Sequence, residues 1–134
     1  MRSCGCLARD IASQQAKNKR LPKGVSARNT VVQGYIKSAK KAGRKWNLTD
    51  KDLTELFAGD CYYCGLPPSN CRKTKSGDSF DYSGIDRMDN SQGYIKENFV
   101  SCCRECNLAK AGREFKEFLD WIKRLVNYHN PKYL

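Results

Sequence analysis

The chain has 134 residues, enough for one modest domain, and 25 Lys and Arg against 14 Asp and Glu give it a net charge of +11. It has no apolar run of about 18 residues and no apolar signal segment near Met1, so we expect no membrane span and a cytoplasmic location. The positive charge favours a polyanionic partner, DNA first and RNA as an alternative, over a merely basic soluble surface.

Residues 1–24 are polar and basic and predict a flexible arm. Four cations cluster before Gly24, and Pro22 interrupts any helix there; the cations are Lys17, Lys19, Arg20 and Lys23. Cys4 and Cys6 resemble half of a metal-binding knuckle, but no second half accompanies them, so we interpret them as free thiols.

Residues 25–59 predict the N-terminal helices. The first runs from Ser26, which can cap it, to Ala42, with Gly43 closing it and an apolar stripe at helical spacing. Its exposed side carries Lys37, Lys40 and Lys41. These lysines either contact phosphates or form an ordinary solvated face, and the sequence favours neither.

A second helix is predicted from a capping box in which Thr49 and Asp52 exchange hydrogen bonds, with Asp in place of the usual Glu. This helix should continue through Phe57 and bury Leu53, Leu56 and Phe57. It leads directly to the first of two Cys-x-x-Cys pairs.

The two pairs are Cys61 with Cys64 and Cys103 with Cys106. Four thiolates at this spacing suit one tetrahedral structural zinc ion, and cysteines in a cytoplasmic protein are more often ligands or thiols than disulfides. Cys71 and Cys102 remain as free thiols, since neighbouring strand residues point to opposite faces and the spacing selects Cys103 over Cys102.

Residues 60–113 predict a compact core between these pairs. We expect an exposed loop over 69–79, a hairpin of strands Tyr82–Met88 and Phe99–Cys102 with Gly93 permitting the turn, and a helix over Arg104–Ala111. Residues 114–134 predict a final helix and tail. The helix Glu114–Tyr128 should bury an apolar face made by Phe115, Phe118, Leu119, Ile122, Leu125 and Val126.

One ordered set of residues resembles a known family: Cys61, Cys64, Gly65, Asp86, Asn98, Cys103, Cys106, Asn107 and Lys110. Their order is similar to that of the HNH endonucleases, the ββα-metal or His-Me finger nucleases, in their zinc-stapled form. The run 84–110 looks especially like small phage-encoded members. The resemblance implies an α+β fold with a small ββα-metal core, stapled by a Cys4 zinc site and flanked by N-terminal and C-terminal helices.

The resemblance also implies an active site. Asp86 at the end of a strand and Asn107 on a helix would hold a catalytic Mg²⁺ or Mn²⁺, and hard oxygen ligands suit these ions. Taken singly, Asp86 could be a turn carboxylate and Asn107 a surface amide. Asn98 would orient the catalytic loop, although simple hairpin capping explains it equally. Lys110 could reach a phosphate or lie exposed to solvent.

Position 87 departs from the family pattern, because Arg87 stands where the family has its general-base His. A guanidinium cannot accept a proton near neutral pH, but its planar fork can bind a phosphate. The base would then be Asp89 first, Tyr94 second, or Tyr82 or solvent hydroxide. The single histidine, His129, fits no motif of the family.

Two functions follow from these observations. The first is a phage-type HNH endonuclease that hydrolyses DNA phosphodiester bonds with a divalent metal ion. The second is a catalytically inactive, zinc-stapled HNH-fold module that binds DNA or RNA, either alone or within a larger assembly. Asp86, Asn98 and Asn107 favour the first function, and Arg87 favours the second.

Overall fold

The computed structural model describes residues 21–129; most of the predicted basic arm, with Cys4 and Cys6, and the last residues of the tail lie outside this range. No helix within that range is long and apolar enough to cross a bilayer. In chain order the elements are α2 (Val25–Lys41), α3 (Asp50–Ala58), β1 (Asn70–Lys73), β2 (Ser79–Tyr82), β3 (Gly84–Arg87), the 3₁₀ turn η1 (Lys96–Asn98), β4 (Phe99–Cys102), α4 (Arg104–Lys110) and α5 (Phe115–His129).

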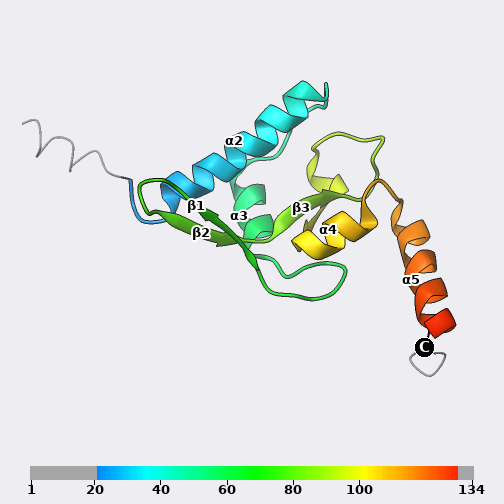
Figure 1. The fold of residues 1–134 in the computed structure, drawn as a ribbon. Coiled ribbons are helices and arrows are strands. Elements are labelled where there is room, and N and C mark those ends of the chain that lie inside the picture. Colours follow the sequence, from blue (N-terminus) through cyan, green and yellow to red (C-terminus); the bar gives the residue numbers. More distant parts are fainter. Residues whose placement is uncertain (1–20, 130–134) are drawn as a thin grey trace, which may run out of the picture.

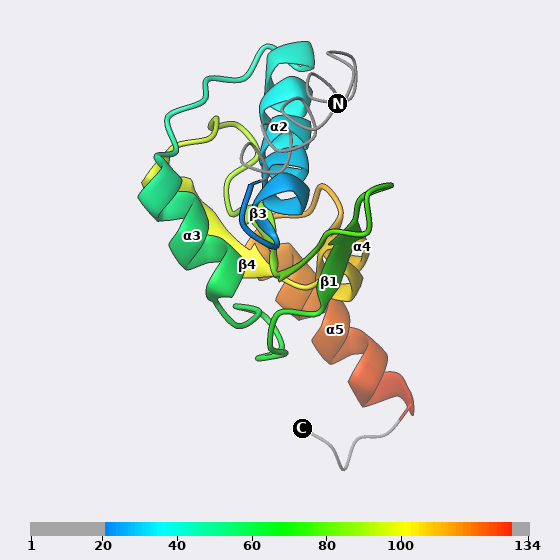
Figure 2. The same cartoon turned by 90° about the vertical axis from the view of Figure 1, so that its left-hand side faces the viewer.

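The four strands form two separate antiparallel hairpins, β1 with β2 and β3 with β4. In the second hairpin Gly84 lies opposite Cys102 and Arg87 lies opposite Phe99. Helix α2 packs against the β1–β2 hairpin, while α3 and α4 pack against β3 (Figures 1 and 2). The fold is therefore a mixed α+β arrangement, as the sequence predicted, with β3 at its centre.

The main core lies between α2, α3 and the two hairpins, where Phe57 is 2% exposed and contacts the rings of Phe80 and Tyr82 edge-on. The capping box at the start of α3 is confirmed: Asp52 N donates to Thr49 Oγ1, and Thr49 N donates to Asp52 Oδ2. These reciprocal bonds satisfy donors that the first helical turn leaves free. The helix that begins with them carries Phe57 into the core.

The start of α2 differs from the prediction. Ser26 does not cap this helix; Gly24 is the N-cap residue, with a left-handed backbone and no side-chain cap of its own. Instead, the carboxylate of Asp78 accepts hydrogen bonds from the backbone N–H groups of Gly24 at 2.6 Å and Ala27 at 3.0 Å. A carboxylate from the β1–β2 turn thus satisfies the helix N-terminus, and a local signal at Ser26 could not predict it.

The predicted loop over 69–79 is wrong, because this stretch contains β1, a turn and the start of β2. Phe80 and Tyr82 alternate along β2 and pack on Phe57, which supplies the apolar contact that a strand needs. The predicted strand Tyr82–Met88 is also divided. Ser83 leaves the ladder, donating from its N–H to Phe57 O and from its hydroxyl to Gly59 O.

Helix α5 forms where expected, but the prediction of a fully buried apolar face is wrong. Within α5 only Phe118 is buried, whereas Leu119 and Leu125 are 36% and 41% exposed. Its first turn is attached to the first cysteine pair, since Phe115 and Phe118 both contact the ring of Tyr63. The rest of the helix extends away from the core (Figure 1).

Candidate metal centre and active site

Four cysteines converge at the junction of the β3–β4 hairpin with α4. The Sγ atoms of Cys61, Cys64, Cys103 and Cys106 all lie within 4.8 Å of one another. The Sγ atoms of Cys64 and Cys103 are 3.7 Å apart, and sulfurs placed tetrahedrally at a Zn–S distance of about 2.3 Å lie about 3.8 Å apart. The donor set and its spacing therefore fit a structural Zn²⁺, and the predicted grouping of these residues is confirmed.

Local backbone geometry turns these thiols toward one point. Gly65 has φ of 75°, which lets its N–H turn back to Cys61 O at 2.8 Å. Cys103 is the N-cap of α4, and its sulfur accepts a hydrogen bond from Cys106 N at 3.4 Å. Burial raises the pKa of the Cys61 thiol, but surrounding backbone N–H groups outweigh burial and lower this pKa to about 6. That environment favours the thiolate, the form that binds metal.

The two remaining described cysteines lie outside the cluster, as predicted. Cys71 is exposed on β1, on the other hairpin. Cys102 is fully buried beside Cys103, and its thiol donates to the carbonyl of Cys103 at 3.2 Å. Burial holds the pKa of the Cys102 thiol far above its usual range. Cys102 therefore acts as a small core residue rather than as a ligand.

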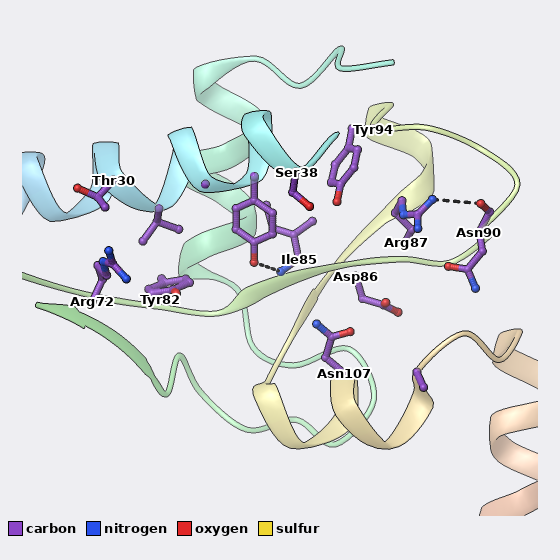
Figure 3. A pocket seen from close by; sticks show the side chains of 14 residues that line it. Thr30, Ser38, Arg72, Tyr82, Ile85, Asp86, Arg87, Asn90, Tyr94 and Asn107 are labelled. Atoms are coloured by element: carbon purple, nitrogen blue, oxygen red, sulfur yellow. Dashed lines mark hydrogen bonds between the residues drawn. The ribbon is translucent and has the colours of Figure 1, made fainter. Parts of the chain in front are cut away.

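A cavity of about 490 Å³ opens between α2, β3 and α4, and Asn107, which follows Cys106 on α4, lines it. It brings together three of the predicted catalytic residues, Asp86 and Arg87 from β3 and Asn107 from α4, and Figure 3 shows Asn107 rising from its helix beside Asp86. The remaining lining residues of interest are Thr30, Gly34, Ser38, Arg72, Tyr82, Asn90 and Tyr94. A carboxylate and an amide oxygen facing one cavity fit a hard divalent cation.

Asp86 is held by two residues whose part the sequence did not reveal. Its Oδ2 accepts a hydrogen bond from Tyr63 Oη at 2.5 Å and lies 3.1 Å from Lys110 Nζ. Lys110 has no exposed surface, and its ammonium also donates to Arg87 O at 3.3 Å. The prediction that Lys110 lies at the surface or contacts a phosphate is therefore corrected, because its side chain turns inward to pair with Asp86.

Asn98 holds the loop that follows β3. Its amide accepts from Asp89 N at 2.8 Å and donates to Asp89 O at 2.9 Å and to Gly93 O at 3.3 Å. Asp89 in turn accepts bonds from Ser91 and Gln92, which lower the pKa of its carboxyl below the usual range. Asp89 is not among the residues lining the cavity.

Arg87 lies at the mouth of the same cavity. Its Nη1 donates to the carbonyl oxygens of Asn90 at 3.1 Å and Gln92 at 3.2 Å, and its guanidinium lies 5.7 Å from the ring centre of Tyr94 (Figure 3). These bonds orient the fork and leave its other nitrogen donors available. Arg72 on β1 is a second cavity arginine that the sequence did not reveal, because it lay in a stretch interpreted as a loop.

Comparisons with known proteins bear on the fold. No known family profile matches the chain. It is 28% identical over 126 residues to "Uncharacterized protein R423" of Acanthamoeba polyphaga mimivirus; the match covers 87% of this chain but 22% of that protein, so the chain spans about a fifth of its relative. The rare-cutting HNH restriction endonuclease PacI has a similar structure, with a TM-score of 0.54 and 22% identity over 80% of this chain and 82% of that one. The chain therefore has an HNH-like α+β fold with a Cys4 cluster.

Proposed function

We propose that this chain is an HNH-type endonuclease that hydrolyses DNA phosphodiester bonds with a divalent metal ion. One observation carries the proposal: Asp86, Arg87 and Asn107 face a single cavity beside the cysteine cluster, on an HNH-like fold. A carboxylate, an amide oxygen and a guanidinium in one cavity supply a cation site and an anion site side by side. That pairing suits a phosphodiester substrate.

In this proposal Asp86 and Asn107 hold Mg²⁺ or Mn²⁺, and the four cysteines hold a structural Zn²⁺. The hard cation, when bound, neutralises charge that develops on the phosphate and on the leaving oxygen. Asn98 keeps the loop after β3 in place through its three bonds to Asp89 and Gly93. The fixed loop then holds the guanidinium of Arg87, at the end of β3, through the carbonyls of Asn90 and Gln92.

Arg87 takes the anion-binding part. Its free donors would contact a non-bridging phosphate oxygen, and a fixed guanidinium stabilises the more highly charged transition state better than the ground state. For the group that accepts the proton of the attacking water, we propose Tyr94 rather than Asp89. Tyr94 lines the cavity against the Arg87 guanidinium, whereas the Asp89 carboxylate already accepts bonds from Ser91 and Gln92.

Nucleic acid would enter along α2. Thr30, Gly34 and Ser38 line the cavity at successive helical turns, and Lys41 lies two turns after Gly34, on nearly the same side. Lys37 flanks this row, whereas Lys40 lies on a different side of the helix. Lys37 and Lys41 are therefore the stronger of the three predicted lysine contacts, and Arg72 adds a cation across the cavity.

A second function, binding without cleavage, is favoured by two observations. Arg87 cannot accept a proton, and the Asp86 carboxylate is already paired with Lys110. A plasmid assay with Mg²⁺ and with Mn²⁺ separates the two functions. We expect nicked or linear product from the wild type and none from Asn107→Ala or from Asp86→Asn, which keeps an acceptor for the buried Lys110, with zinc content and DNA binding retained. Binding without product under both ions would reject the endonuclease.

A further inference from the structure

The pairing of Asp86 is uneven between its two oxygens. Oδ2 receives both the Tyr63 hydroxyl, at 2.5 Å, and the Lys110 ammonium, at 3.1 Å. Oδ1 accepts no hydrogen bond from any of residues 21–129, and the Asp86 side chain lines the cavity. One oxygen of this carboxylate is therefore occupied from inside the protein, and the other has no partner and is reached by solvent, so it is the oxygen available to a cation.

The two residues that occupy Oδ2 belong to the cysteine-cluster segments. Tyr63 lies between Cys61 and Cys64, and Lys110 ends α4, the helix that Cys103 caps. Both are fixed in place: Lys110 has no exposed surface, and Tyr63 packs against Phe115 and Phe118. The cluster thus sets the orientation of the Asp86 carboxylate through the residues it anchors.

The charge of Lys110 has an effect that the Tyr63 hydroxyl does not have. A buried ammonium compensates most of the Asp86 charge, and it repels a divalent cation approaching the same carboxylate. With Asn107 supplying only a neutral amide, the two proposed ligands offer little net negative charge. A substrate phosphate would supply the missing charge.

We propose that Lys110 is a positioning residue that makes binding of the catalytic cation depend on the substrate. It directs Oδ1 of Asp86 into the cavity and keeps the cation affinity of the DNA-free protein low. The inference rests on the proposed function for the identity of the cation site. By linkage, DNA then tightens cation binding and the cation tightens DNA binding by the same factor.

The test is Mn²⁺ titration of the zinc-loaded, full-length protein, followed by electron paramagnetic resonance, with and without a short DNA duplex. Lys110→Gln removes the charge but keeps a donor for Asp86 and for Arg87 O. Lys116→Gln, at an exposed position of α5, is the matched control for loss of one positive charge. Titrations of Asp86→Asn and of the duplex without protein measure the Mn²⁺ binding that lies outside this site.

We expect the duplex to tighten Mn²⁺ binding to the wild type by roughly ten-fold or more, a typical size for coupling between sites. Lys110→Gln should bind Mn²⁺ without DNA roughly ten-fold more tightly than wild type and lose most of the DNA effect, whereas Lys116→Gln should match wild type. Equal DNA-free affinities of the wild type and Lys110→Gln would overturn the proposal.

Zinc content and thermal unfolding will show whether Lys110→Gln folds. If it does not, Mn²⁺ binding to the wild type with and without the duplex tests the proposal. Binding of Mn²⁺ at Asp86 that is equally tight with and without the duplex overturns the inference. The plasmid assay is scored separately. A wild type that cuts DNA but shows no coupling rejects this inference alone, while coupling without cleavage rejects the endonuclease and leaves the role of Lys110 standing.

Discussion

Asp78, in the turn between β1 and β2, accepts a hydrogen bond of 2.6 Å from the backbone N–H of Gly24 at the start of α2. With the second bond from Ala27, this contact fastens the helix that borders the cavity to the hairpin that carries Arg72. The two segments are more than fifty residues apart in the sequence. Helix α2 also packs on this hairpin, but this polar link between them is a single carboxylate, so its contribution can be tested by changing one residue.

Asp78→Asn is expected to lower the melting temperature at neutral pH and to lose that effect in acid. The N–H groups of Gly24 and Ala27 hold the pKa of the Asp78 carboxyl below its usual range. A lowered folded-state pKa gives stability that is present above the unfolded pKa, near 4, and is lost as the pH falls through the folded value. Melting curves from pH 7 to pH 3 test this. For Asp120→Asn, on the exposed side of α5, the difference in melting temperature from the wild type should not change in this way with pH.

Removal of the cysteine-bound metal is expected to unfold the site. Purified protein should contain about one zinc per chain, and Cys61→Ser should lose it together with much of the thermal stability. Cys71→Ser should retain both, because Cys71 is exposed on the other hairpin. Metal analysis and thermal unfolding of the two variants give the comparison, and a folded wild type without zinc would contradict the prediction.

Arg87→Ala is expected to slow cleavage by about 2–4 kcal/mol in activation free energy, if the guanidinium acts as other fixed oxyanion donors do. Arg87→Lys should recover part of this, because a point charge lacks the bidentate fork. Arg87→His tests the alternative function. If only Arg87→His cuts, and with a pH dependence near the His pKa, the natural chain is a binding module.

Thermal unfolding of each variant must be measured beside its cleavage rate, because Arg87 also donates to the carbonyls of Asn90 and Gln92 and its loss affects the loop as well. A correctly folded Arg87→Ala variant that cuts as fast as the wild type would show that the guanidinium does not contact the phosphate.

Binding to DNA is expected to weaken steeply with salt, because each phosphate that a cation neutralises releases counterions. The double variant Lys37→Gln and Lys41→Gln should reduce the salt slope by roughly one for each phosphate that is no longer neutralised. Lys51→Gln, on the exposed surface of α3, should leave the slope unchanged. Affinity that does not change between low and physiological salt would argue against a nucleic-acid partner.

Signals confined to a few neighbouring residues predicted the structure well. The Thr49 capping box predicted the start of α3, because it depends on contacts within one turn. The two cysteine pairs are far apart in the sequence, but each pair is a local signal, and the need for four ligands predicted their convergence. Gly93 was expected to permit a turn conformation. Instead, a side chain there would approach Lys45 O to 2.8 Å, so glycine is needed for close packing between distant segments.

Features that depend on distant partners were the ones the sequence could not predict. The periodicity of α5 predicted an apolar face correctly, but a pattern on one helix does not say whether another element covers it. Lysine is usually a surface residue, and only the position of Asp86 on β3, against which α4 packs, explains the burial of Lys110. In the candidate site, sequence therefore identified the cavity residues Asp86, Arg87 and Asn107 better than it identified Tyr63, Arg72 and Lys110, which support or complete the cavity.

The two cysteine pairs also bracket every strand described between residues 21 and 129, since β1 through β4 all lie between Cys64 and Cys103. An ion bound by both pairs would join the two ends of this segment into a loop. Closing a long loop costs chain entropy, which the contacts formed within it must offset. The second pair leaves the ribosome only after both hairpins have been synthesised. During synthesis, an ion can therefore be held by all four thiols only after both hairpins and the start of α4 have emerged.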